Sequence, residues 1–247
     1  WDTVQDCQRY IRRAADKMLN KVDLYSYFSS SDMIFSELAV KIQGAIMKAI
    51  STEYAEKLHI SGYHPYSVYV FPYGSGFVIR VSSLNNEAEE IIRRIYRLSE
   101  IRIYGADEPM IITDKKPYAP VSAENLGNEF SGKGCRIEFV TPAMIKTGGR
   151  PTARPDIAAY FYSVIQKYNE FENACLNYNE FFEAWNSSDM TDYELKSCKY
   201  NVSGHLFPGM TGFCDIVFPK NEKQKNLLSR VISYAAFCGV GGKTGMG

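Results

Sequence analysis

Histidine side chains could transfer protons in this protein, because the ordinary pKa of imidazole lies near neutral pH. The sequence contains three histidines, His59, His64 and His205. His59 ends a stretch with helical periodicity, where the negative end of the helix dipole would favour an imidazolium and so a general acid. A histidine in that position is equally typical of a cap on free carbonyl groups. The residues alone leave both interpretations open.

The neighbouring candidates also have ordinary explanations. His64 follows in a predicted loop and could be a second proton-transfer group or simply a solvent-exposed residue. Lys57 and Tyr54 could assist with charge on a substrate, although a lysine in the last turn of a helix is usually only solvated. His205 lies in a predicted turn between two strands, and we interpret it as structural.

The sequence lacks the spacings that metal and nucleotide sites require. No C-x-x-C pair occurs among its six cysteines, which are Cys7, Cys135, Cys175, Cys198, Cys214 and Cys238. No group of histidines and carboxylates has metal-ligand spacing. Gly242-Lys243-Thr244 resembles the end of a Walker A loop, but Phe237 occupies the position of its first glycine and the stretch follows a predicted helix. We therefore expect reduced cysteines, no metal and no cofactor.

Glycine makes up five of the eleven residues from Phe237 to Gly247. Backbone amides without side-chain bulk, together with Lys243, would suit contacts to phosphate. Glycine content alone would also fit a flexible tail, but the regular apolar positions Val240 and Met246 favour a structured loop. The glycines of this candidate phosphate site are Gly239, Gly241, Gly242, Gly245 and Gly247.

Basic residues gather in two further places. Lys146, Arg150 and Arg154 fall in a window without acidic residues, and glycines and a proline there predict an exposed loop that could follow a phosphate backbone. A second group lies on a predicted helix among glutamates, which is more typical of a salt-bridged helix face. That group consists of Arg93, Arg94, Arg97 and Arg102, with Glu89, Glu90 and Glu100.

Composition limits the class of protein. The chain has 247 residues, 45% of them hydrophobic, which is enough to bury a core in one large domain or two small ones. Its 28 Lys and Arg residues balance 28 Asp and Glu residues, so any basic surface must be local. No window is long and apolar enough for a membrane helix, and basic residues in the first twenty exclude a secretory signal. We expect a soluble, cytoplasmic protein, either a monomer or a homodimer.

The periodicity of the apolar residues predicts one order of elements twice. The first set is a strand at 21–28, a helix from 38 toward 59, strands at 67–71 and 77–81 around a turn at 72–76, a helix at 88–98 and strands at 101–104 and 110–113. The second is a strand at 135–141, helices within 156–185, strands at 195–203 and 212–218 around turns at Gly204 and Pro208-Gly209, and a helix from 221.

This repeated order predicts an α+β fold of two tandem ferredoxin-like, RRM-type domains, with antiparallel sheets and helices on one face. Prolines between 115 and 120 mark the predicted boundary. We expect an N-terminal domain of residues 1–117, with an extra amphipathic helix at 1–20, and a C-terminal domain of residues 118–247 that ends in the glycine-rich loop.

Four stretches, in the same order, resemble a known family. Gly239-Val-Gly-Gly-Lys-Thr-Gly-Met-Gly247, directly after a helix, is similar to the glycine-rich signature of the CRISPR-associated repeat-processing endoribonucleases of the RAMP superfamily. The other three stretches are Ala55-Glu-Lys-Leu-His59 with Pro65-Tyr-Ser67, Phe77-Val-Ile-Arg80-Val, and Phe139-Val-Thr-Pro142 with Pro155-Asp156. The resemblance runs from about residue 21 to residue 247.

The resemblance implies a metal-independent endoribonuclease that cleaves CRISPR precursor RNA within its repeats. His59 matches the catalytic histidine of the family, and His64 is the candidate partner. RNA contacts are implied for Arg80, Lys146, Arg150, Arg154, Lys243 and the glycines of the 239–247 loop. The implied partner is CRISPR repeat RNA, and CRISPR effector or adaptation proteins are further candidates.

Two departures from the family and two other functions stay open. The family usually continues after the glycine-rich loop into a last strand, and the helix at 1–20 has no counterpart in it. The chain could instead be a non-catalytic RAMP subunit that binds guide RNA, which needs no histidine at position 59. It could also be a ferredoxin-like regulator that binds a small molecule, assembles as an oligomer and has no affinity for RNA.

Overall fold

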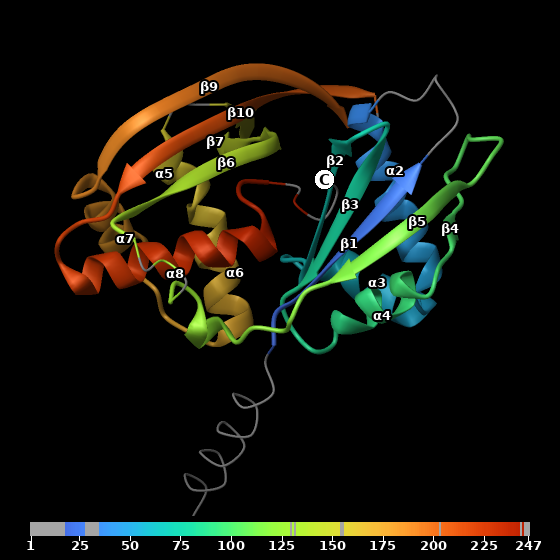
Figure 1. Cartoon of the computed structure of the whole chain (residues 1–247), viewed down its shortest axis with the longest axis horizontal. Coiled ribbons are helices and arrows are strands. Elements are labelled where there is room, and N and C mark those ends of the chain that lie inside the picture. The colour runs from blue at the N-terminus through green and yellow to red at the C-terminus, as the bar shows by residue number, and fades with distance from the viewer. Residues whose placement is uncertain are drawn as a thin grey trace, which may run out of the picture.

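The described part of the chain forms two larger antiparallel sheets, each covered by helices on one face, and a separate two-stranded hairpin (Figure 1). A computed structural model describes residues 18–27, 35–128, 130, 132–153, 156–202, 204–242 and 244. The predicted helix at 1–20 therefore falls almost wholly outside the described residues. The architecture agrees with the predicted pair of ferredoxin-like folds. None of the helices in the described part of the chain is long and apolar enough to cross a membrane.

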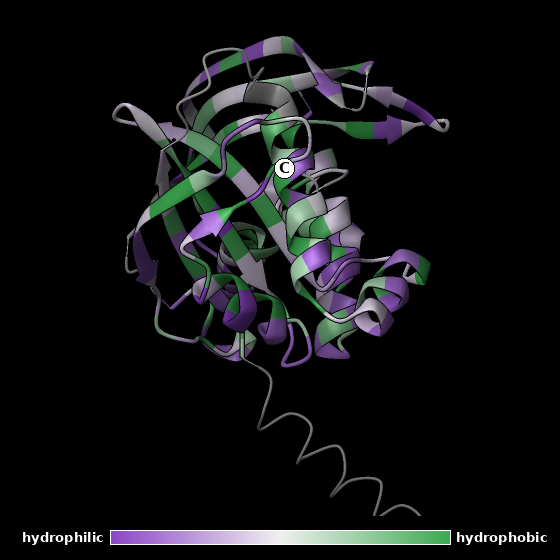
Figure 2. Cartoon of the chain, turned by 90° about the vertical axis from the view of Figure 1, so that its right-hand side faces the viewer, coloured by the Kyte–Doolittle hydropathy of each residue, from purple (hydrophilic) through white to green (hydrophobic). Residues whose placement is uncertain are grey.

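The first sheet has the strand order β2-β3-β1-β5-β4. Its strands are β1 (Asn20–Tyr27), β2 (Tyr66–Tyr73), β3 (Gly76–Ser83), β4 (Glu100–Ile101) and β5 (Met110–Pro117). Alternate residues of β1, such as Val22 and Leu24, belong to the core beneath the helices. Lys21 and Asp23 therefore face the opposite side, because side chains alternate along a strand. Figure 2 shows this alternation of hydrophobic and hydrophilic residues along the strands.

Three helices cover the first sheet: α2 (Phe35–Ala49), α3 (Thr52–Ile60) and α4 (Glu89–Tyr96). The sequence predicted one continuous helical run toward His59. This was wrong, because α2 ends at Ala49 and a separate helix begins after Ser51. The Ser51 side chain accepts a hydrogen bond from the Tyr54 amide at 3.3 Å and so begins a new helix. The Asn85 side chain accepts from the Ala88 amide at 2.8 Å, just ahead of α4.

The second sheet has the order β6-β10-β9, formed by β6 (Gly134–Ala143), β9 (Asp189–Val202) and β10 (His205–Val217). After β6, a short hairpin pairs β7 (Ile145–Thr147) with β8 (Arg150–Thr152). A 3-10 turn, η1 (Ala123–Asn125), precedes the sheet, and its helices are α5 (Ile157–Tyr160), α6 (Tyr162–Glu172), α7 (Tyr178–Asn186) and α8 (Glu222–Cys238).

Two local predictions were wrong. Pro208-Gly209 is not a turn, because both residues lie inside β10, which pairs with β9 along its length. A Cβ on Gly209 would come within 3.1 Å of the Tyr200 ring, so this glycine permits close packing inside a strand. β4 is also much shorter than predicted. β5, in contrast, continues through Lys115 and Lys116 to Pro117, where we predict the N-terminal domain to end.

The long β9–β10 hairpin connects the two halves. In Figure 1 it arches from the second sheet toward α2. Tyr200 and Phe207, from its two strands, form a small apolar cluster with Met144 and with Val40 of α2. At the other end of the first sheet, Leu19 belongs to the core of the second half. The two halves are therefore joined on both sides of the space between the sheets.

Candidate functional site

His59 lies in the last turn of α3 and is exposed to solvent. The helix ends one residue later, and the Ser61 amide donates to the Lys57 carbonyl at 3.1 Å. Because a backbone amide already satisfies this carbonyl, a role for His59 as a cap is not needed there. Its imidazole is free to meet a ligand at the surface.

His64 lies in the short loop between α3 and β2 and is half-buried. Its ring lies 5.6 Å from the ring of Tyr66, and its buried Nδ1 has no hydrogen-bond partner among the described residues. Desolvation lowers the pKa of His64, and the positive charges of Lys167 and His59 lower it further. The three groups are therefore close in space, and His64 is neutral at pH 7.

The other two candidates near His59 are held by the protein. Lys57 donates to both carboxylate oxygens of Glu87, at 2.6 and 2.8 Å. Burial, and after it the charge of Glu87, raises the pKa of Tyr54, so its phenol stays protonated. The structure thus brings His59 and His64 together and gives Lys57 an internal partner.

Lys167 is a buried cation beside this pair. It projects from α6, is 6% exposed, and donates to the Cys238 carbonyl at 2.8 Å and to Thr244 Oγ1. Burial lowers its pKa. Through these two hydrogen bonds Lys167 connects the end of α8 to the glycine-rich loop, which we define as residues 239–247.

The amides of the three described glycines in the glycine-rich loop donate inside the protein. Gly239 donates to Ala235 at 2.8 Å, Gly241 to Tyr160 at 3.2 Å, and Gly242 to Met144 at 2.9 Å, in each case to the backbone carbonyl. They are therefore not open to phosphate in this conformation. Lys243, Gly245 and Gly247, also predicted to contact phosphate, lie outside the described residues.

The predicted basic loop is the β7–β8 hairpin. Lys146 lies on β7 and Arg150 on β8, both exposed, and the turn between them is formed by Gly148 and Gly149 with positive φ of 58° and 78°. Arg154, the third predicted contact, lies outside the described residues. Neither Lys146 nor Arg150 forms an ion pair with a residue that the structure describes.

Arg80 is held in a buried ion pair. Its guanidinium donates to Asp23 through Nε at 2.5 Å and Nη2 at 2.6 Å, and Asp23 is only 2% exposed. It also donates to the Tyr69 hydroxyl at 2.9 Å. The bond to Asp23 raises the pKa of Arg80 further. Arg80 thus lies on the open face of the first sheet with its main donors already used.

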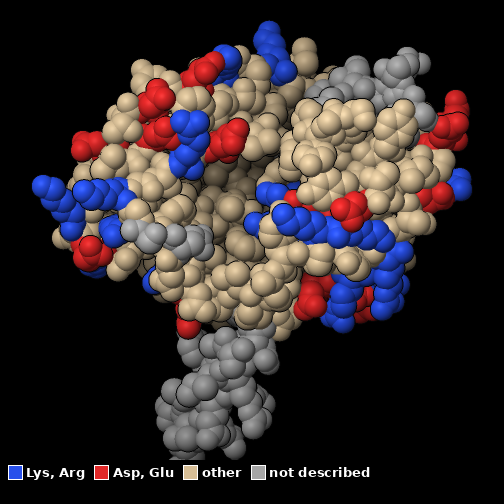
Figure 3. All heavy atoms as spheres, in the orientation of Figure 1, with Lys and Arg blue, Asp and Glu red and all other residues tan. Residues whose placement is uncertain are grey.

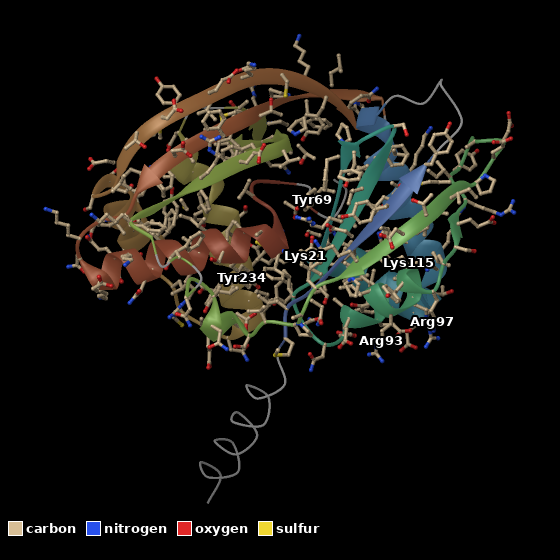
Figure 4. All side chains as sticks on the ribbon, in the orientation of Figure 1. Lys21, Tyr69, Arg93, Arg97, Lys115 and Tyr234 are labelled. Carbon is tan, nitrogen blue, oxygen red and sulfur yellow. The ribbon has the colours of Figure 1, made fainter. Side chains whose placement is uncertain are left out.

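The arginines of α4 form the salt-bridged face that the sequence favoured. Arg94 donates to Glu90 at 2.6 Å, and Arg93 lies 3.7 Å from Glu89. Figure 4 shows Arg93 and Arg97 on the side of the first half away from the second sheet, whereas Lys21 and Tyr69 point into the space between the sheets.

A cavity of about 310 Å³ lies between β2, β6 and the end of α8, where Figure 3 shows the surface hollowed. Ser67 from β2 and Gly239 from the glycine-rich loop are among its lining residues, but neither His59 nor His64 is. His205 is exposed on β10. Within the described residues, no group of three histidine, cysteine or carboxylate side chains could hold a metal ion.

Comparison with known proteins shows similarity to one family. The family model for the CRISPR-associated endoribonuclease Cas6 matches residues 137–247. The chain is 23% identical over 232 residues to the CRISPR-associated endoribonuclease Cas6 of Streptococcus thermophilus, covering 89% of this chain and 93% of that protein. It is 24% identical over 222 residues to the Mycobacterium tuberculosis protein of the same name, covering 85% and 69%.

Solved structures show the same fold. Thermus thermophilus Cas6 matches with a TM-score of 0.70 at 21% identity, over 94% of this chain and 96% of that one. A Cas6 product complex matches with a TM-score of 0.77 at 17% identity, over 93% and 96%. The chain is similar to Cas6 endoribonucleases in sequence over most of its length and in fold. The resemblance drawn from four short stretches is thus confirmed.

Sequence reasoning missed one charged residue beside the two histidines, Lys167. A signal was present, because Lys167 lies between Val164 and Tyr168, among the buried positions of α6. A lysine at such a position must either reach water or find buried partners. Its partners come from the end of α8 and the glycine-rich loop, and no local pattern identifies them.

Proposed function

We propose that this protein cleaves CRISPR precursor RNA within its repeats to produce guide RNAs. The observation that carries this proposal is the likeness to Cas6 endoribonucleases along nearly the whole chain, combined with two histidines at the junction of α3 and β2. Similar Cas6 structures include complexes with a product and with a substrate mimic. A transcript is the proposed substrate, so we also propose a cytoplasmic location.

The proposed chemistry is an internal transfer at phosphorus. A base removes the proton of the 2′-hydroxyl, whose oxygen forms a bond to the adjacent phosphorus. The bond from phosphorus to the 5′-oxygen breaks, and an acid protonates the leaving oxygen. The products are a 2′,3′-cyclic phosphate and a 5′-hydroxyl. The step consumes no water and needs no metal, only two proton-transfer groups and positive charge near the phosphate.

His64 and His59 suit the two roles. The pKa of His64 is lowered by burial and by the charges of Lys167 and His59, which gives the neutral imidazole that a base requires. His59 is exposed in the last turn of α3, where its imidazole can reach bound RNA. We assign His64 as the base and His59 as the acid that protonates the 5′-oxygen.

RNA binding is proposed for the hairpin and the glycine-rich loop. Lys146 and Arg150 carry exposed charge at the tip of the hairpin, and Arg154 follows it in the chain. We propose that Arg80 supports binding indirectly, since its ion pair with Asp23 shapes the open face of the first sheet. Lys243, Gly245 and Gly247 remain proposed contacts in the same loop as Gly239, Gly241 and Gly242.

Cleavage of repeat RNA in excess chelator tests the proposal. We expect cleavage by the unaltered protein, none by His59→Ala and none on a substrate with deoxyribose at the cut site. His205→Ala is the matched control, because His205 is also an exposed histidine but lies on β10. Tight binding without cleavage would instead identify a non-catalytic RAMP subunit. Absence of any binding would point to the small-molecule regulator.

A further inference from the structure

The glycine-rich loop is bonded to the root of the basic hairpin. Met144 is the single residue between the end of β6 at Ala143 and the start of β7 at Ile145. Its side chain is fully buried, and its carbonyl accepts the Gly242 amide at 2.9 Å. The neighbouring amide, from Gly241, bonds to the last residue of α5, Tyr160. The loop therefore ties the hairpin root to the helices of the second half.

Gly241 is the position in this contact that requires glycine. Its φ of +74° is in the left-handed region, and a Cβ would lie 2.2 Å from the Met144 carbonyl oxygen. Backbone would have to move to admit any side chain. Gly242 is different, because a Cβ there would meet only the flexible end of the Met144 side chain, at 3.2 Å. The close approach that excludes a side chain is therefore at Gly241.

The far end of the hairpin carries the charge. A Cβ on Gly148 or Gly149 would meet nothing within 4 Å, so the turn projects into open space. Lys146 on β7 pairs with Pro151, and Arg150 on β8 pairs with Thr147, so the two cations lie in adjacent pairs beside this turn. The position of both cations therefore depends on how the root at Met144 is held.

We infer that Gly241 is a positioning residue for RNA: it holds the β7–β8 hairpin so that Lys146 and Arg150 reach the phosphate backbone. The described glycines then act through the hairpin, and their own amides, which are bonded internally, do not bind phosphate. This inference rests on the proposed function, because it presumes RNA as the ligand. Lys167, which fastens the same loop through Thr244, supports the arrangement from the other side.

The salt dependence of RNA binding separates the two roles. Each phosphate contact that a cation makes on single-stranded nucleic acid contributes about 0.7 to the slope of log K against log salt concentration. Lys146→Gln with Arg150→Gln should make the slope shallower by up to about 1.4, twice that value. Gly241→Ala removes no charge, yet it should make the slope shallower in the same way. Gly44→Ala, on α2, where a Cβ would meet nothing within 4 Å, should leave both affinity and slope unchanged.

Combining the changes gives the decisive comparison. Gly241→Ala should weaken binding no more than about twofold further in the Lys146→Gln, Arg150→Gln background, which is the usual scatter of additive effects. Direct contact of loop amides with phosphate would instead give full additive losses and an unchanged slope for Gly241→Ala. That result would overturn the inference. Absence of RNA binding by the unaltered protein would overturn the proposed function as well, and with it the inference.

Folding is measured alongside. Loss of folded protein lowers the amount of active material but does not change the salt slope of the remainder, so the slope reports position and not stability. If thermal unfolding shows Gly241→Ala unfolded at the assay temperature, Thr244→Val replaces it. That variant removes only the acceptor of Lys167. We expect a smaller change of slope in the same direction, and an unchanged slope would count against the inference.

Discussion

The ion pair between Arg80 and Asp23 should be a main support of the first sheet. Both bonds are short, 2.5 and 2.6 Å, and Asp23 is almost completely buried. Arg80→Gln leaves this carboxylate buried with the Tyr118 hydroxyl, at 2.8 Å, as its remaining strong donor. Removing one partner of a buried pair costs about 3–5 kcal/mol, and the surviving donor places this case near 3.

The same chain offers a control with equal geometry and different burial. Arg136 donates to Asp215 at 2.7 and 2.6 Å, but the side chain of Arg136 is 53% exposed. Exposed pairs contribute little because water solvates both partners. Arg136 also stacks on Phe213, 3.9 Å from its Cζ to the ring centre. Arg136→Gln therefore removes a ring contact in addition to the ion pair. A smaller loss of stability than for Arg80→Gln would then be due to the exposure of the Arg136–Asp215 pair.

Thermal and denaturant unfolding of the two variants test this reasoning. For a chain of this size, about 3 kcal/mol corresponds to a fall in Tm of roughly 6–12 °C for Arg80→Gln. Arg136→Gln should change Tm far less. Adding Asp23→Asn to Arg80→Gln should recover part of the loss, since no charge is then buried. Equal effects of the two single variants would refute the argument from burial, as would a double variant that recovers nothing.

Two further predictions concern titratable groups. Desolvation and the positive charges of Lys167 and His59 oppose protonation of His64. The fall of kcat/KM on the acidic side of its pH profile should therefore lie below pH 6.5. Lys167→Met removes one of these charges and should move that fall to higher pH. A limb that stays in place would exclude His64 as the titrating base. A thiol reagent at pH 8 should modify exposed Cys175 before Cys214 and Cys238, because burial raises the pKa of both buried thiols to about 11. In a Cys7→Ser background, Cys175→Ser should remove the fast phase of labelling, and persistence of that phase would contradict the prediction.

The spacing of apolar residues along strands and helices predicted the fold well, because the residues on the buried face of an element must be apolar. Residues such as Val22, Leu24 and Ile42 repeat with the period of their element and are buried. Glycine and proline were less informative. Gly209 lies inside β10, where the Tyr200 ring of the paired strand β9 packs against it, and the local sequence does not show that contact. Ser51 broke a helix that periodicity alone continued.

The candidate site, like the fold, was predicted only in part from the sequence. The spacing of His59 and His64 placed two histidines around one helix end, and the structure keeps them near each other. Arg80 matched a family position, but its partner Asp23 comes from another strand, so its burial could not be foreseen. The amides of Gly241 and Gly242 were predicted to be free, and their acceptors lie in segments far apart in the chain.

The zero net charge of the chain makes the position of each cation important. A strongly basic protein attracts RNA from many directions, whereas a neutral one gains little from long-range attraction. Several basic residues near the proposed site are also paired, as Lys57 is with Glu87 and Arg80 with Asp23. Affinity must then come from a few cations held where phosphates pass, such as Lys146 and Arg150. Under these conditions, displacing the hairpin through Gly241 should cost nearly as much binding as removing its charges.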